Sequence, residues 1–179
     1  VHPDIAVFAK AMANGYAMSA VIGREEIMQA AQQTFISSTN WTERIGPTAA
    51  LATINKLKSE EVNKSIVDIG KTVKKKWSII SQKHDLKINI GGLDSLPQFS
   101  FPDDQELKIA TYFSQLMLDE GYLATDQFKP SFAHDHKKID AYAHSFDNTF
   151  AKIKNSIQKN NIDKKLKSKP ARRGFYRLT

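Results

Sequence analysis

Two short apolar runs near the start of the chain predict β-strands. Residues 5–8 are apolar without interruption, and a second run at residues 18–22 follows the turn signal Asn14-Gly15. Runs without polar residues are typical of strands covered on both faces, as in parallel sheets. Two such strands do not form a covered sheet by themselves, so we expect a large upstream portion of the fold in addition to these residues.

Apolar residues spaced by three and four positions predict helices in most of the remaining chain. The helices are expected at residues 25–33, 47–57, 62–80, 102–120 and 139–157. Further strands are expected at residues 86–90, 96–101, 122–124 and 130–133. Helices and strands in alternation predict an α/β chain, with a small α+β domain after about residue 55.

The composition is that of a folded domain. The chain of 179 residues is 41% hydrophobic and 25% charged, which is enough apolar material for a core. It contains no cysteine, so disulfides, thiolate metal sites and thiol nucleophiles are excluded. No apolar run reaches the length needed to span a membrane. These features predict a soluble, cytoplasmic protein with no membrane partner.

The net charge of +7 is concentrated at the end of the chain. Residues 151–179 contain ten Lys or Arg and one acid, whereas residues 1–150 contain 16 basic and 18 acidic groups, a net charge of −2. We therefore interpret the basic excess as a solvated C-terminal helix and tail, and a nucleic-acid partner is not expected. The alternative from a different functional class is a non-catalytic basic module that binds nucleic acid or an acidic partner.

Lys10 directly follows the first apolar strand and precedes the Asn14-Gly15 turn, which places its amine at a strand end. Partial desolvation of such a lysine would lower its pKa and favour the neutral amine, which can form a Schiff base with a carbonyl group. The alternative is an ordinary surface lysine, and position alone favours that alternative.

The residues around Lys10 favour the Schiff-base interpretation over an ordinary surface lysine. The segment PDIAVFAKAMANGYAMSAVIGR, residues 3–24, resembles the cofactor-lysine segment of the class III aminotransferases, which depend on pyridoxal 5′-phosphate (PLP). The shared order is Pro-Asp, an apolar strand, the lysine, a turn with glycine and a second strand. The resemblance implies that Lys10 binds PLP as a Schiff base and is the catalytic residue.

A second segment, FISSTNWTERIGPTAALA at residues 35–52, resembles the family's loop into a long alanine-rich helix. In relatives, a threonine five residues before the proline binds the cofactor phosphate of the neighbouring subunit, and here that residue is Thr42. A hydroxyl group and backbone amides near a helix start suit a phosphate dianion. The WTER sequence around Thr42 and the ending GFYRLT, residues 174–179, are similar to the glutamate-1-semialdehyde aminomutase branch of the family.

The resemblance implies the C-terminal part of a fold-type-I PLP-dependent transferase. Residues 1–55 would end the large PLP-binding domain, and residues 56–179 would form the small domain. The enzyme would move an amino group between a small-molecule amino donor and a carbonyl acceptor through Lys10. It would act as a homodimer in which Thr42 reaches the neighbouring subunit's cofactor. Intramolecular transfer, as in glutamate-1-semialdehyde 2,1-aminomutase, is the alternative.

In this family the residues that hold the cofactor's pyridine ring lie upstream of the lysine. The resemblance therefore implies that the present residues alone bind PLP weakly or not at all. Activity would need the upstream part, supplied by the same or another polypeptide.

His134 and His136 do not predict a metal site. With no cysteine and only scattered carboxylates nearby, they fall short of a ligand set. His134 and Asp135 instead suit the start of the last predicted helix.

Overall fold

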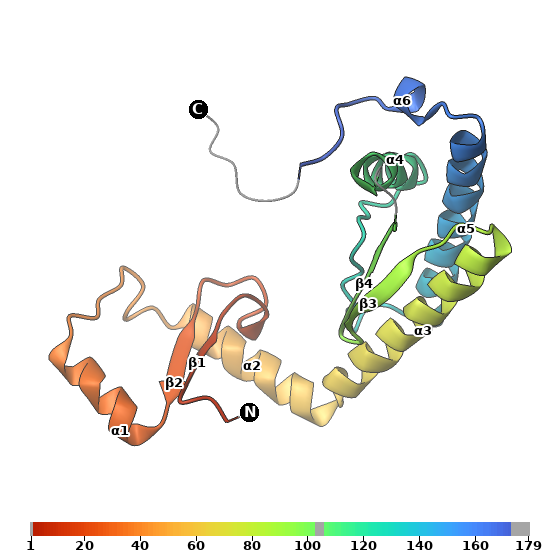
Figure 1. Ribbon diagram of the computed structural model, residues 1–179. Helices are drawn as coiled ribbons and strands as arrows, with labels where there is room; N and C mark the ends of the chain where they lie inside the picture. Colours follow the sequence, from red (N-terminus) through yellow and green to blue (C-terminus); the bar gives the residue numbers. More distant parts are fainter. Residues whose placement is uncertain (1, 103–105, 173–179) are drawn as a thin grey trace. The chain divides into compact units, whose positions relative to one another are not determined.

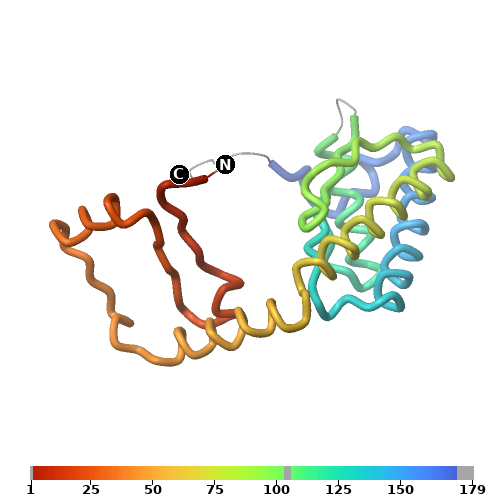
Figure 2. The backbone as a smooth tube through the Cα atoms, turned by 90° about the horizontal axis from the view of Figure 1, so that it is seen from below, coloured from red at the N-terminus to blue at the C-terminus, as the bar shows by residue number. Residues whose placement is uncertain are grey.

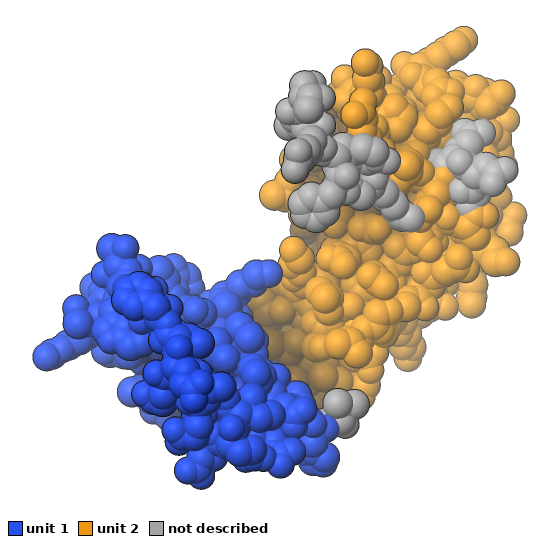
Figure 3. Space-filling view, turned by 60° about the vertical axis from the view of Figure 1, so that its left-hand side comes forward, with its two compact units in different colours: residues 1–62 blue, residues 63–179 orange. Residues whose placement is uncertain are grey.

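The computed structural model describes residues 2–102 and 106–172. The chain divides into two compact units, residues 1–62 and residues 63–179, which are coloured separately in Figure 3. The predicted domain limit at residue 55 falls within a helix of the first unit and stays a prediction. The ending that resembles the aminomutase branch, residues 174–179, lies outside the described residues.

The first unit contains a two-stranded antiparallel sheet of β1 (Ile5–Phe8) and β2 (Ala20–Gly23), shown in Figure 1. Both predicted strands are confirmed, but their predicted burial on two faces is wrong. Val7 is 69% exposed, and the other exposed apolar residues of the pair are Ile5, Phe8, Val21 and Ile22. The reason is that the pair bonds to no third strand within the described residues, whereas strands of a parallel sheet are covered by neighbours and helices.

Short helical segments and one longer helix complete the first unit. They are η1 (Lys10–Met12), α1 (Glu25–Met28), η2 (Gln29–Gln33) and α2 (Ile45–Ser59), of which η1 and η2 are 3₁₀ turns. The predicted helix at residues 25–33 is therefore α-helical only in its first part. Along α2 only Gly46 and Ala50 are buried, so this helix contributes little apolar side-chain area to a core.

The second unit is built from four helices and a β-hairpin within the described residues (Figures 1 and 2). Its elements are α3 (Val62–Lys83), β3 (Asn89–Leu93), β4 (Leu96–Ser100), α4 (Glu106–Asp119), α5 (His136–Gln158) and α6 (Ile162–Lys165). The predicted helices at residues 62–80 and 139–157 are confirmed with nearly the expected limits. The predicted helix at residues 102–120 is described from Glu106 to Asp119, and residues 103–105, which belong to its predicted start, lie outside the described part.

The hairpin strands β3 and β4 are antiparallel and pair Gly92 with Pro97. On its other side, β4 bonds to an irregular segment: Phe99 N–H donates to the Asp126 carbonyl (2.9 Å), and Phe128 N–H donates to the Pro97 carbonyl (3.0 Å). The predicted strands at residues 122–124 and 130–133 are wrong. The extended pairing lies between them, where only an isolated bridge joins Gln98 and Gln127.

Aromatic side chains form the centre of the second unit. Phe99 of β4 contacts aromatic rings from all three long helices, at centroid distances that include 4.9 Å to Trp77, 5.3 Å to Phe113 and 5.6 Å to Phe146. The Trp77 indole N–H donates to the Tyr142 hydroxyl (3.1 Å), so the buried indole is satisfied. Helices α3, α4 and α5 are thus packed on one face of the hairpin through a single cluster.

The described part of the tail is docked along α4, but its lysines are exposed, which agrees with the predicted solvated segment. The Gln115 side chain of α4 accepts from Lys167 N–H (2.8 Å) and donates to the Lys165 carbonyl (3.0 Å). One helical turn away, Lys167 Nζ bonds Asp119 (2.8 Å), and Ala171 N–H donates to the Thr111 hydroxyl (2.8 Å). The basic residues follow α4 because its Thr, Gln and Asp lie four residues apart on one face.

Among the described helices, none combines the length and the apolar composition that a membrane span needs.

Candidate cofactor-binding site

Lys10 lies at the junction between β1 and η1, as the sequence predicted. It is exposed and has a φ of 53°, in the left-handed region that residues other than glycine seldom adopt. Three consecutive turns hold this backbone. Met12 N–H donates to the Ala9 carbonyl, Asn14 N–H donates to the Ala11 carbonyl, and Tyr16 N–H donates to the Ala13 carbonyl. No hydrogen bond or ion pair engages the Lys10 amine within the part of the chain that the structure describes. The predicted partial desolvation of this amine is not observed.

The turn that follows Lys10 packs against the start of α2. Ala13 is completely buried, and η1 contacts α2. A β-carbon added at Gly46 would lie 3.1 Å from the Ala17 carbonyl oxygen and 3.2 Å from the β-carbon of Met18. Such distances leave little room for a side chain, so glycine allows α2 to approach the lysine segment closely.

Thr42 lies in the loop just before α2 and is exposed. The loop is closed by two turns, in which Trp41 N–H donates to the Ser38 carbonyl (3.2 Å) and Glu43 N–H donates to the Asn40 carbonyl (3.1 Å). Among the described residues, none forms a hydrogen bond with the Thr42 hydroxyl. The loop thus presents an available hydroxyl group beside a helix start.

Glu43 is the residue of this region that sequence reasoning missed. Its two carboxylate oxygens accept from the amides of Ile45 (2.6 Å) and Gly46 (2.9 Å). These two hydrogen bonds lower the pKa of Glu43, and the one from Gly46 has the larger effect. An acid next to a predicted helix start was the available signal, because carboxylates are stabilised there. The amides that were expected to suit a phosphate are therefore already bonded to Glu43.

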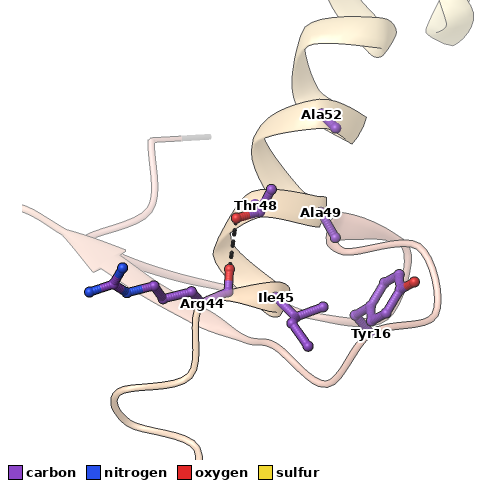
Figure 4. A pocket seen from close by; sticks show the side chains of 6 residues that line it. All are labelled: Tyr16, Arg44, Ile45, Thr48, Ala49 and Ala52. Carbon is purple, nitrogen blue, oxygen red and sulfur yellow. Dashed lines mark hydrogen bonds between the residues drawn. The ribbon is translucent and has the colours of Figure 1, made fainter.

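A shallow hollow of about 400 Å³ lies beside this region and is shown in Figure 4. Its lining residues are Tyr16, Arg44, Ile45, Thr48, Ala49 and Ala52. In Figure 4 the Tyr16 ring lies toward Ile45 and Ala49, whereas the Arg44 guanidinium extends to the opposite side. The Thr48 hydroxyl donates to the Arg44 carbonyl (2.8 Å), which closes the first turn of α2. Lys10 and Thr42 are not among the lining residues.

His134 and Asp135 act as helix-start residues in the structure. Asp135 is the N-cap of α5 and accepts from Lys138 N–H (2.8 Å), and the Lys138 side chain together with this amide lowers the pKa of Asp135. His134 Nδ1 accepts from Ser131 N–H (3.0 Å), and burial lowers the pKa of His134. Over residues 2–102 and 106–172, no group of three or more His, Asp or Glu is arranged to hold a metal ion.

Comparison with known proteins decides the family. The family model "Aminotransferase class-III" matches residues 1–149, which include Lys10, Thr42 and most of the second unit. This chain belongs to the class III aminotransferases. The family predicted from the two segments is confirmed.

Relatives of this class III chain include aminotransferases and aminomutases. The 3-aminobutyryl-CoA aminotransferase of Cloacimonas acidaminovorans is 33% identical over 122 residues, which cover 65% of this chain and 30% of that protein. A glutamate-1-semialdehyde 2,1-aminomutase of Lachnoclostridium phytofermentans is 28% identical over 157 residues, 77% of this chain and 37% of that protein. The chain therefore spans about a third of the length of these relatives.

The fold of the class III chain is confirmed by a solved structure. The PLP internal aldimine form of the FumI protein of Sphingopyxis sp. MTA144 matches with a TM-score of 0.82 at 23% identity. The match covers 87% of this chain and 38% of that chain. The described residues thus have the mixed α/β fold of part of a PLP-dependent transaminase, as predicted.

Proposed function

We propose that this chain carries the cofactor lysine, Lys10, and one phosphate contact, Thr42, of a PLP-dependent aminotransferase. The reaction would move an amino group from a small-molecule amino donor to a carbonyl acceptor. The observation that carries the proposal is the family match over residues 1–149, in which Lys10 follows the first strand and is exposed.

The residues present fit the cofactor. Lys10 offers a primary amine and Thr42 a hydroxyl group, and neither is bonded to another described residue. When bound, PLP supplies an electron sink that stabilises negative charge on the substrate carbon. Lys10 Nζ would hold the cofactor covalently and, once released by the substrate amine, would take a proton from the carbon that bears the nitrogen. Thr42 would donate its hydroxyl proton to a phosphate oxygen.

A homodimer is part of this proposal. Apolar residues are exposed in and around the loop that carries Thr42: Phe35 (95% exposed), Ile36, Trp41 and Ile45. A monomer rarely exposes such a group of large apolar side chains without a partner. They support a second subunit beside this loop, with Thr42 directed to that subunit's cofactor. A cytoplasmic location also belongs to the proposal, because the sequence contains no cysteine.

The second candidate function is intramolecular amino transfer. It is favoured by the aminomutase among the relatives, 28% identical over 157 residues. The residues that carry the chemistry would be the same, because Lys10 Nζ would move protons at two neighbouring carbons of one molecule. Analysis of the products distinguishes the two reactions: an aminotransferase converts two substrates, whereas an aminomutase isomerises one.

The basic binding module is not supported by the described basic residues of α5 and the tail. Several of these lysines form ion pairs within the second unit, including Lys152 with Glu120 (2.8 Å), Lys154 with Asp85 (2.9 Å) and Lys167 with Asp119 (2.8 Å). Charges that are paired in this way are less available to an external polyanion.

The proposed function is tested by amino transfer with the longest native polypeptide that carries this sequence. That polypeptide, reconstituted with PLP, is assayed against a panel of amino donors with a keto-acid acceptor, beside Lys10→Ala and a matched control, Lys58→Ala. Lys58 is an exposed lysine on α2. We expect the control to keep the activity and Lys10→Ala to lose it. Equal activity of Lys10→Ala and the wild type would overturn the proposal.

A further inference from the structure

Glu43 connects the two segments assigned to the cofactor. On its N-terminal side, the Glu43 amide closes the turn that contains Thr42 by donating to the Asn40 carbonyl (3.1 Å). On its C-terminal side, the Glu43 carboxylate bonds the Ile45 (2.6 Å) and Gly46 (2.9 Å) amides. The same residue therefore closes the turn that contains Thr42 and connects the loop to the start of α2.

The anchor extends to the lysine segment through Gly46. This glycine is buried, and a β-carbon at its position would lie 3.1 Å from the Ala17 carbonyl oxygen and 3.6 Å from the Glu43 carboxylate. Ala17 belongs to the stretch that follows the Lys10 turn. A continuous chain of contacts thus runs from Thr42 through Glu43 and Gly46 to the lysine segment.

The geometry points to a positioning role for Glu43: we propose that its carboxylate fixes the loop in the conformation in which the Thr42 hydroxyl contacts the cofactor phosphate. This inference rests on the proposed function. Side chains next to a helix start commonly stabilise it by bonding its free amides, and the Glu43 carboxylate satisfies two of them at once. A neighbouring loop residue held in this way would lose less conformational freedom when it binds a ligand.

The substitution series compares the rate of PLP release in the longest native polypeptide that carries this sequence. In Glu43→Ala both hydrogen bonds are lost, and we expect release to be faster by about tenfold. Glu43→Asp keeps a carboxylate of the type that caps helix starts, and we expect its PLP release to be nearly as slow as that of the wild type. Glu60→Gln is the matched control, because Glu60 follows the other end of α2 and forms an exposed ion pair with Lys56. Its release rate should equal that of the wild type.

A double-mutant cycle with Thr42→Val separates positioning from simple stabilisation. If Glu43 acts through Thr42, then Glu43→Ala should have little further effect on PLP release once the Thr42 hydroxyl is absent. Thermal unfolding of the PLP-free proteins is measured in parallel. Additive effects in the cycle would overturn the inference. So would a Glu43→Ala protein with lowered stability and unchanged release, or one that retains PLP more tightly because the freed amides bind the phosphate.

Failure of the proposed function gives a different result. In that case the wild type itself would not retain PLP, or Lys10→Ala would retain it equally well. Normal retention by the wild type, dependence on Lys10 and no effect of Glu43 would overturn the positioning role alone.

Discussion

The two units differ in how they use their apolar residues. In the second unit the aromatic rings of three helices meet around Phe99, and the Phe113, Phe146 and Phe150 side chains are completely buried. Among the described residues of the first unit, the completely buried apolar side chain is small, that of Ala13, while large ones such as Val7 and Phe35 are exposed. The second unit therefore has a core of its own, whereas the first presents surfaces suited to packing against further protein. The unit that carries Lys10 is therefore the one whose large apolar side chains are exposed and would be covered only by further protein.

The largest expected effect comes from removing a central ring. Phe146→Ala should lower the free energy of unfolding of the second unit by about 3–5 kcal/mol, because it removes contacts to several rings and leaves a cavity. Phe35→Ala, in the exposed loop of the first unit, should change the free energy of unfolding of the second unit by less than about 0.5 kcal/mol. Urea unfolding followed by tryptophan fluorescence measures both. Equal effects of the two substitutions would contradict the difference in core packing between the two units.

Close packing of α3 against the hairpin gives the next largest effect. A β-carbon at Gly70 would overlap the Asp94 carbonyl oxygen, whereas one at Gly91 would have no atom within 4 Å. Helix propensity alone predicts that Gly70→Ala stabilises the protein by about 1 kcal/mol. The overlap should reverse the sign and destabilise it by roughly 1–3 kcal/mol. Gly91→Ala should be nearly neutral, and a stabilised Gly70→Ala protein would show that the packing here is loose.

A smaller effect is expected from an ion pair between α3 and α5. Burial opposes ionisation of Asp147, but hydrogen bonds from Lys83 and His84 outweigh it and lower the pKa of this carboxyl. A lowered pKa stabilises the folded protein above the pKa of the unfolded chain, about 4, and this stability is lost as the pH falls through the folded value. Because the pair is partly exposed, the loss should be under about 1 kcal/mol.

The matched pair for this pH dependence is Asp147→Asn and Asp4→Asn. Asp4 pairs with Arg24 at 3.3 Å in the first unit, where both side chains are more than half exposed. Stability measured from pH 7 to pH 3 should lose part of its acid dependence in Asp147→Asn and keep it in Asp4→Asn. The reverse order would contradict the assignment of the stronger pair to the second unit.

The sequence predicted most of the local structure and the family, while Lys10 as the cofactor lysine stays a prediction. The periodic pattern around Trp77 and Phe146 specified two long helices because one face of each is buried in the core. The ordered residues around Lys10 were sufficient to indicate the family. The predicted helix end at residue 120 is also close to the observed end of α4 at Asp119, and Gly121 follows with a φ of 89°, which suits glycine.

Other features could not be read from the sequence because they depend on distant residues. The exposure of Val7 depends on which strands are present beside it. The tail docks through Gln115, a residue that is ordinary in any local pattern. Pairing of Phe128 with β4 joins segments that are far apart in the chain, and the carboxylate of Glu43 has a role only once α2 begins at Ile45.

The central claim is that Lys10 is the cofactor lysine, and borohydride trapping tests it most directly. The longest native polypeptide that carries this sequence is incubated with PLP, reduced with borohydride, digested and mapped by mass spectrometry. We predict a pyridoxyl group on Lys10, absent from Lys10→Ala and unchanged in Lys58→Ala. Labelling of another lysine in the wild type, with Lys10 unmodified, would contradict the account.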